Sequence, residues 1–332
     1  MNKTADIKHK DQHASPGLRA FQLALMVLAL LTCLAGSPLS LAQTSSPTTA
    51  KSLVYIADSE NERLNRRLRE LLMDAFGESV MVRSFVPGQT SQDSESPVIA
   101  IGPTAFTTVR SENKRVPVLG LLIDEPYISR SQEDPDSQVS AVFSTPPLIR
   151  QVALGKAILP YSTRVAMLAR PDTEHLYDSV LRDLEHLDME GRVFLIPSNE
   201  RLIPTLIRAL DYGDFVLAAS DDSVYNPRTI KHILLTSYRR NRIVIGPVQA
   251  YVKAGSLAST FTPLTAVAQM TADYVRHFWQ SNAFPEPAHP NEFGIEINHQ
   301  VGRSLNIPLP ERDVLNDLVI QRLESAEASK NE

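Results

Sequence analysis

The chain has 332 residues, of which 43% are hydrophobic, and a formal net charge of −5. This length and composition allow one large domain or two lobes, each with a sizeable core. Acidic residues outnumber basic ones and no basic patch dominates, which excludes nucleic acid as an expected partner.

The first 42 residues have the three parts of a secretory signal peptide. Four basic residues precede an apolar run over 23–35, and small residues follow, ending in "SPLSLAQ". This pattern predicts an exported, periplasmic protein whose signal peptide (1–42) is cleaved after Ala42. Residues 43–51 are then a polar linker. Two alternatives are a transmembrane anchor, for which the apolar run falls short of the roughly 20 residues needed, and a lipid anchor at Cys33.

From residue 52 onward, short apolar runs alternate with helical patterns. The runs that predict strands are 52–57, 80–85, 97–102, 116–123, 138–144, 164–169, 191–196, 214–219 and 241–246. Helices are predicted after the first run, from Pro103, and over 146–159, 174–188, 199–210 and 227–240. Strands that alternate with helices indicate parallel sheets covered by helices on both faces.

Local signals mark where these elements begin and end. Ser59 and Glu62 have the spacing of a capping box, and Gly77 ends the helix that follows. The stretch "DEPYISR" is predicted to be a loop.

Nine strands exceed what one compact sheet is expected to hold. The polar loop 129–138 divides the series after its fourth strand, and we predict an α/β fold of two doubly wound parallel-sheet lobes. Ligands of such sheets bind beyond the carboxyl ends of the strands. The loops at these ends are 57–60, 102–105, 124–127 and 220–226.

The loop 220–226, "SDDSVYN", carries the densest group of polar side chains. Asp221, Asp222 and Tyr225 can be interpreted as a clamp for a ligand amine or hydroxyl, or as caps that compensate the dipole of the next helix. Thr104, at a helix start, can help to bind an anion through free backbone N–H groups or belong to a simple strand–helix turn.

Enzyme motifs are absent from the sequence. It has no G-x-S-x-G nucleophile elbow and no H-E-x-x-H zinc motif. The histidines after residue 42 do not recur at metal-ligand spacing. We therefore predict a protein without catalytic residues, bound metal or cofactor.

Three stretches carry a resemblance to a known family. They are "PVQAYVKAGSLAST", "TAVAQMTADYVRHFWQ" and "FGIEINHQVGRSLNIPLPE". Together with "SVYN" after an acidic residue, they resemble the substrate-binding proteins of ABC importers in the group with tryptophan- and phenylalanine-binding members. These proteins are similar to class I periplasmic binding proteins, and the resemblance covers about residues 52–315.

The resemblance implies three chain crossings between the lobes, near 141–145, 257–263 and 285–293. On this basis the first lobe comprises 52–143 plus 262–286, and the second comprises 144–261 plus 287–332. Gly255 and Ser256 would then lie in the hinge, where small residues let the backbone pass close to the cleft.

The sequence departs from the family pattern at several positions. Val248 and Gln249 replace an acidic pair that often precedes "VKAG". Where the family has a turn of Asp-Asn-Thr type, this chain has Asp221-Asp222-Ser223. Where the family has Ser-Asp-Pro, this chain has Asp124-Glu125-Pro126. The resemblance implies an amino-acid-like ligand, and these departures leave its identity open.

The predicted function is capture of a small molecule between two lobes and its delivery to an ABC permease and ATPase. The alternative is a sensor or scaffold of the same fold that signals to a membrane kinase or cyclase. The predicted ligand-binding residues are Ser59, Thr104, Glu125, Asp221, Asp222, Tyr225 and Gln249.

Overall fold

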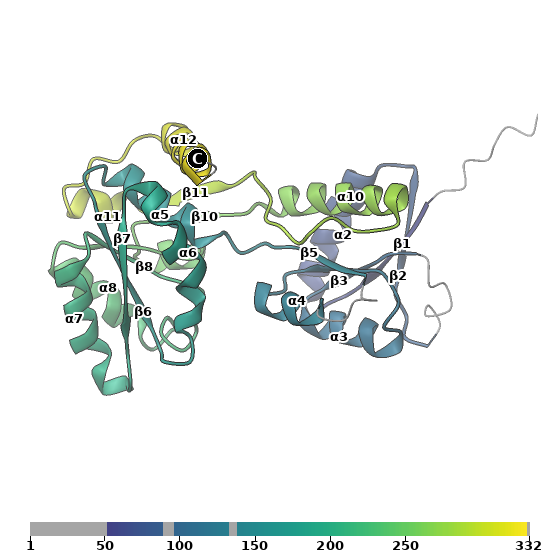
Figure 1. The fold of residues 1–332 in the computed structure, drawn as a ribbon, viewed down its shortest axis with the longest axis horizontal. Coiled ribbons are helices and arrows are strands. Elements are labelled where there is room, and N and C mark those ends of the chain that lie inside the picture. The colour runs from purple at the N-terminus through teal and green to yellow at the C-terminus, as the bar shows by residue number, and fades with distance from the viewer. Residues whose placement is uncertain (1–51, 89–95, 133–137, 331–332) are drawn as a thin grey trace, which may run out of the picture. The chain divides into compact units, whose positions relative to one another are not determined.

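The computed structural model describes residues 52–88, 96–132 and 138–330. The predicted signal peptide and linker lie outside these residues. Within the described ranges, the strands form one sheet of five and one of six (Figure 1). None of the helices in these ranges is both long and apolar enough to cross a lipid bilayer.

The first lobe is built on the five-stranded sheet, in which every pair of neighbours is parallel in the order β2-β1-β3-β4-β5. Its strands are β1 (Ser52–Ala57), β2 (Val80–Ser84), β3 (Val98–Ile101), β4 (Val118–Leu121) and β5 (Val139–Val142). Its helices are α2 (Glu62–Phe76), α3 (Pro103–Glu112), α4 (Glu125–Ser131) and α10 (Leu264–Ser281).

Alternation along each strand divides this lobe into two core layers. Val54 and Ile56 of β1 face the layer formed with α2 and α10, whereas Tyr55 and Ala57 face the layer formed with α3 and α4. Because both faces are covered, β1 is a nearly continuous apolar run. Helix α10, from far along the chain, lies beside α2 (Figure 1).

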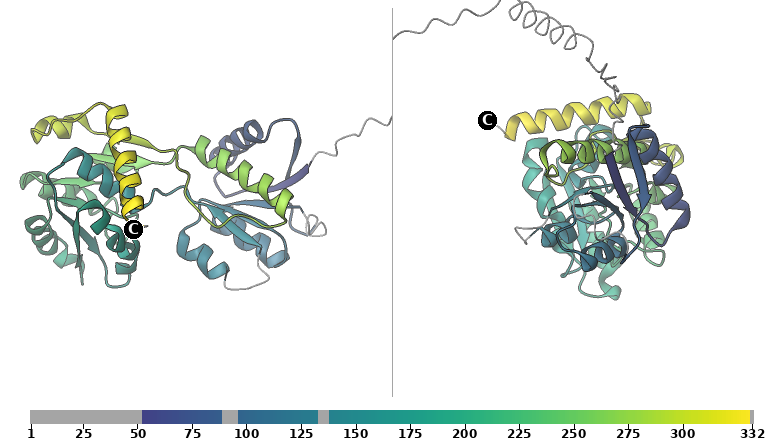
Figure 2. Two further views of the ribbon diagram at one scale, coloured as in Figure 1. Left: turned by 45° about the horizontal axis from the view of Figure 1, so that its top comes forward. Right: turned by 90° about the vertical axis from the view of Figure 1, so that its right-hand side faces the viewer.

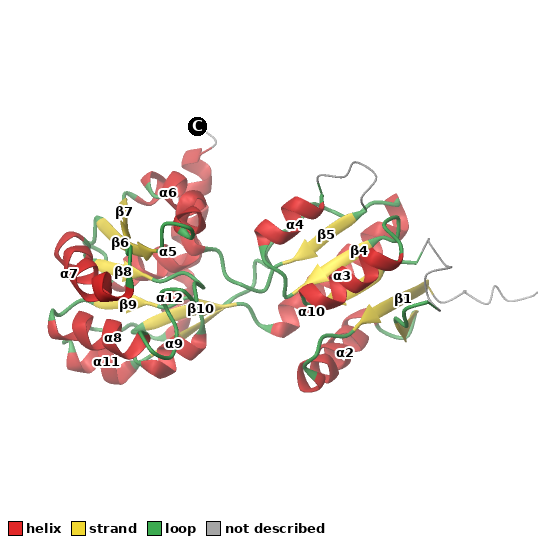
Figure 3. Cartoon of the chain, turned by 90° about the horizontal axis from the view of Figure 1, so that it is seen from below, coloured by secondary structure: helices red, strands yellow, loops and turns green. Residues whose placement is uncertain are grey.

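The second lobe is built on the six-stranded sheet, in the order β11-β10-β9-β8-β6-β7. Figure 3 shows β10, β9, β8, β6 and β7 of this sheet side by side. Its strands are β6 (Arg164–Ala169), β7 (Glu190–Leu195), β8 (Phe215–Leu217), β9 (Ile243–Ile245), β10 (Ala258–Phe261) and β11 (Gly294–Ile297). Only β11 runs antiparallel among these described strands.

The helices of the second lobe cover both faces of its sheet. They are α5 (Leu148–Ile158), α6 (Asp178–Asp183), α7 (Leu202–Tyr212), α8 (Ile230–Arg239), α9 (Gln249–Ala254), α11 (His299–Ser304) and α12 (Arg312–Lys330). Short 3₁₀ turns are η1 (Glu174–Tyr177), η2 (Glu185–Leu187) and η3 (Asn199–Arg201). Helices α5 and α12 pack together on one face, and α7 and α8 on the other. Helix α12 is the long yellow helix in both views of Figure 2.

The chain passes between the two sheets three times within the described residues. The passages are 143–147 from β5 to α5, 262–263 from β10 to α10, and 282–293 from α10 to β11. The first and third are paired: the Phe143 N–H donates to the Ala288 carbonyl at 3.0 Å, and the Ala288 N–H donates to the Ala141 carbonyl at 3.2 Å.

Several local predictions are wrong. Asn61, not Ser59, caps α2, because its Oδ1 accepts the Leu64 N–H at 3.1 Å. The stretch "DEPYISR" is helical as α4: Pro126 suits a first helical turn, and Ile128 is buried against the sheet.

The predicted division at loop 129–138 is also wrong. Strand β5 pairs with β4 over four residues, so the fifth strand stays in the first sheet. The predicted helix 174–188 is broken into η1, α6 and η2, and it ends at Asp188 with a positive φ of 52°.

The stretch 257–263, predicted to cross between the lobes, consists mainly of strand β10, and the chain crosses only at its end. Gly255 ends α9 and Ser256 follows it, both before β10, which pairs with β9 and β11 in the second sheet. The crossing itself comes after β10, at Thr262 and Pro263.

Gly255 has a φ of +121°, a conformation that side chains with a Cβ rarely adopt. Gly255→Val should therefore lower the free energy of unfolding by at least about 1 kcal/mol. Urea unfolding tests this, with Ala254→Val at the preceding exposed helical position as the control, expected to cost about 0.7 kcal/mol or less. Equal losses for the two variants would contradict a backbone constraint at Gly255.

Candidate functional site

A cavity of about 710 Å³ lies beyond the carboxyl ends of β4, β5, β6 and β8. The first lobe lines it with residues around the start of α4, namely Asp124, Glu125, Pro126, Tyr127 and Arg130. The crossing segments add Phe143, Thr145, Pro146, Pro147 and His289. The second lobe adds His175, Asp178, Ser179, Arg182, Asp183, Ala219, Ser220 and Pro247.

Glu125 and His289 form a close polar pair at this cavity. His289 Nε2 lies 2.7 Å from Glu125 Oε1. The hydrogen bond and the nearby imidazole lower the pKa of Glu125, although partial burial opposes the shift. The ionised carboxylate thus contributes stability above the pH at which an unfolded glutamate ionises, and this contribution is lost as the pH falls through the lowered pKa.

The second-lobe wall is held in place by a buried tyrosine. Tyr177 donates from its hydroxyl to the Leu168 carbonyl at 3.1 Å and accepts the Ala219 N–H at 3.1 Å. Burial raises the pKa of Tyr177, so the hydroxyl keeps its proton. These bonds tie the turn after β6 to the end of β8, and the turn carries His175 and Asp178 to the cavity.

Charge is mixed on both walls. The first lobe places Asp124 and Arg130 at the cavity, and the second places Asp178 and Arg182 there. Such a lining can meet a polar ligand with both donor and acceptor groups. Across the part of the chain that the structure describes, no cluster of three or more histidine, cysteine or acidic residues could hold a metal ion.

Of the predicted ligand-binding residues, the structure places Glu125 in the lining of this cavity. Asp221 is buried, and its carboxylate accepts hydrogen bonds from Thr173 Oγ1 at 2.6 Å and from the Ser223 N–H at 2.8 Å and Oγ at 2.5 Å. Tyr225 is fully buried, and Asp222 is exposed. Asp221, Asp222 and Tyr225 do not line the cavity, whereas Ser220, which precedes Asp221, does.

The other three predicted residues also lie away from the cavity lining. Ser59 is held to Asn65, whose Oδ1 accepts its hydroxyl at 2.6 Å. Thr104 is exposed on α3. Gln249 donates to Glu296 Oε2 at 3.4 Å.

The sequence analysis missed the second-lobe wall. His175, Asp178, Ser179 and Arg182 follow strand 164–169, in the same position relative to their strand as the loops that were considered. The signal that points to this turn is its place at the carboxyl end of the predicted strand 164–169, where ligands of parallel sheets bind.

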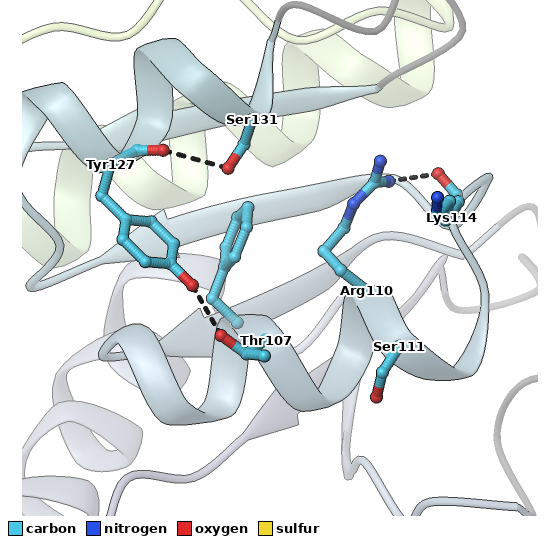
Figure 4. Close-up of a pocket in the computed structure, with 7 residues that line it drawn as sticks. Thr107, Arg110, Ser111, Lys114, Tyr127 and Ser131 are labelled. Carbon is cyan, nitrogen blue, oxygen red and sulfur yellow. Dashed lines mark hydrogen bonds between the residues drawn. The ribbon is translucent and has the colours of Figure 1, made fainter.

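A second cavity, of about 330 Å³, lies within the first lobe between α3 and α4 (Figure 4). The hydroxyls of Thr107 and Tyr127 are 2.6 Å apart, and Arg110 donates to the Lys114 carbonyl. Tyr127 lines both cavities.

The chain resembles solved structures in its fold, at low sequence identity. No protein-family model and no curated protein matches the chain. Among solved structures, the chain is similar to a substrate-binding protein with adhesive properties from Clostridium difficile, in its ligand-free, open form. The TM-score is 0.62 and the identity 13%, over 80% of this chain and 97% of the other.

Two further structures have TM-scores of 0.51. One is an ABC domain in complex with L-Trp from Streptococcus pneumonia, 16% identical over 80% of this chain and 98% of the other. The other is a conserved domain protein from Vibrio cholerae, 17% identical over the same shares. The chain therefore has the fold of periplasmic-binding-protein-like substrate-binding proteins: two parallel-sheet α/β lobes joined by three crossings.

Proposed function

We propose that this chain is an exported, periplasmic binding protein that captures a small polar ligand between its two lobes and presents it to an ABC importer. Ligand contacts from both lobes would stabilise a closed arrangement, which the permease would recognise. The chain would act by binding, without catalysis and without a cofactor.

One observation carries the proposal: the cavity is lined by carboxyl-end residues of both sheets and by the crossing segments. Ligands of open α/β sheets bind at this edge. A ligand that touches both α4 and α6 would bridge the lobes, and its binding energy would then favour closure.

The lining suggests how a ligand would be held. Asp124 and Asp178 can accept hydrogen bonds from an amine or hydroxyl, and Arg130 and Arg182 can meet a carboxylate. The rings of Tyr127 and Phe143 supply apolar contact surface. An amino-acid-like ligand fits this set, which agrees with the L-Trp bound by one structural neighbour.

The first experiment is mass spectrometry of small molecules released from the purified protein, followed by calorimetric titration of the compound found. L-Tryptophan is the first candidate to titrate. Small-angle X-ray scattering should show the protein becoming more compact on binding. A protein that binds no small molecule from periplasmic extract, or binds one without compaction, would contradict the clamp function and favour the scaffold alternative.

Asp178→Ala should weaken binding of the identified compound by about 5- to 150-fold, the range for leaving a buried polar partner unpaired. Asp172→Ala is the matched control, because Asp172 is exposed in the same turn but does not line the cavity. If the two variants bind the compound with equal affinity, Asp178 does not contact it.

A further inference from the structure

The third crossing (282–293) is hydrogen-bonded to the first lobe on one side of a single residue and to the second lobe on the other side. Up to Ala288 it is attached to the first lobe: Ser140 Oγ donates to the Pro285 carbonyl at 2.5 Å, and Ala288 pairs with β5. From Pro290 it is attached to the second lobe, because Arg150 Nη2 donates to the Pro290 carbonyl at 3.1 Å. His289 lies between the two attachments.

The second-lobe attachment is firm. Arg150 is buried, and its guanidinium carbon lies 4.6 Å from the centre of the Phe293 ring. The segment before residue 289 is bonded to the first lobe, and the segment after it is bonded to the second lobe. When the lobes move relative to one another, the third crossing must therefore change its backbone conformation near residue 289. Hinges absorb such changes over a few residues at element ends.

The His289 side chain is held at one nitrogen and unpaired at the other. Nε2 faces Glu125 Oε1, and a carboxylate accepts hydrogen bonds, so Nε2 carries the proton in this pair. The ring centre is 5.1 Å from that of Phe143. Nδ1 is buried and has no hydrogen-bond partner among the residues that the structure describes.

We propose that His289 is the positioning residue of the hinge, and that its protonation shifts the arrangement of the lobes. This inference rests on the proposed two-lobe function. A second proton would give the buried Nδ1 an N–H without an acceptor, which is unfavourable for a charged group. The charge would also strengthen the bond from Nε2 to Glu125. With the ring held at Glu125, rotation of the backbone around residue 289 would bring Nδ1 to water or to an acceptor.

Histidine side chains ordinarily change charge between pH 5 and 8, and this is the pH range over which the lobe arrangement is to be measured. The pKa of Glu125 is lowered by this contact, so the carboxylate stays ionised there. The other charged or titratable groups around His289 and the cavity that it lines are Asp124, Arg130, Arg150, His175, Asp178, Arg182 and Asp183.

The test measures the distance between the lobes in ligand-free protein. Dyes are placed through Glu78→Cys in the first lobe and Tyr161→Cys in the second, where Tyr161 is 97% exposed. The full chain also carries Cys33→Ser, so that only the two labels react. Between pH 8 and pH 5 the ratio of lobe arrangements should change at least about fivefold, the lower end for a coupled equilibrium.

His289→Gln is the matched variant, because its amide can still donate to Glu125 but cannot gain a proton. It should abolish the pH response. Glu125→Gln, which keeps a hydrogen-bond acceptor without the charge, should also reduce the response and serves if the first variant does not fold. A wild-type distance that ignores pH, or a response that both variants keep, overturns the proposal.

The same labels separate this proposal from the proposed function. Titration with L-tryptophan, or with the compound recovered from the protein, at pH 8 reports ligand-driven closure. If His289→Gln loses the pH response and no ligand closes the lobes, the role of His289 is supported and the binding function is contradicted. If a ligand closes the lobes but His289→Gln keeps the pH response, only the role of His289 is contradicted.

Discussion

Gln151→Leu should lower the free energy of unfolding by about 3 kcal/mol. The Gln151 side chain is fully buried at the start of α5. Its Nε2 donates to the carbonyls of Pro247 and Thr260, each at 3.1 Å, and its Oε1 accepts the Thr260 N–H at 2.9 Å. Leucine fills a similar volume but leaves these groups unpaired, at about 1–3 kcal/mol for each buried group that stays unsatisfied.

Urea unfolding of the variant measures this loss. Gln269→Leu is the control, because Gln269 is exposed on α10, and it should change stability by about 0.5 kcal/mol or less. If the two variants unfold at the same urea concentration, the hydrogen bonds of Gln151 to Pro247 and to β10 do not stabilise the fold.

Asp221→Ala should cost about 2–3 kcal/mol of stability and leave ligand affinity within about threefold of wild type. The three donors that surround its carboxylate come from Thr173 and Ser223. Hydrogen bonds to charged groups are worth about 1.5–3 kcal/mol each, and removal of the carboxylate takes the acceptor away from these three partly buried bonds. The carboxylate therefore acts as a structural tie between two loops at the edge of the second sheet.

Thermal unfolding and calorimetric titration of the same variant separate stability from binding. Asp222→Ala is the adjacent control: its side chain is exposed, and only its backbone carbonyl accepts a hydrogen bond, from Asn226. If Asp221→Ala loses much of its ligand affinity while its stability is unchanged, Asp221 binds the ligand directly.

Much of the fold could be predicted because apolar runs and helical periodicity are local signals. The run 164–169 coincides with β6, and 52–57 with β1. Strand β10 was missed because Ser259 and Thr260 look like a polar loop. Both are fully buried, and Gln151, 109 residues earlier, satisfies the Thr260 backbone. No local pattern reveals a partner at that separation.

The candidate site was predictable to a lesser degree. Glu125 follows a predicted strand, and the carboxyl-end rule was enough to select it. The same rule selected Asp221, but its role depends on Thr173, 48 residues earlier in the chain. Whether a polar residue at a strand end faces a ligand or another loop is decided by such long-range contacts.

The discontinuous lobes also have a consequence for biosynthesis. The first sheet gains its covering helix α10 only after most of the second sheet has been translated. The second sheet in turn requires β11 and α12, which complete its edge and cover α5 through Leu315 and Val319. Until α10 has been translated, a nascent chain therefore holds two unfinished cores, and the second stays open until β11 and α12 emerge. Apolar surface that is exposed in this period favours aggregation. Termination between α10 and β11 would leave the second core open while the strands and helices of the first lobe are already present.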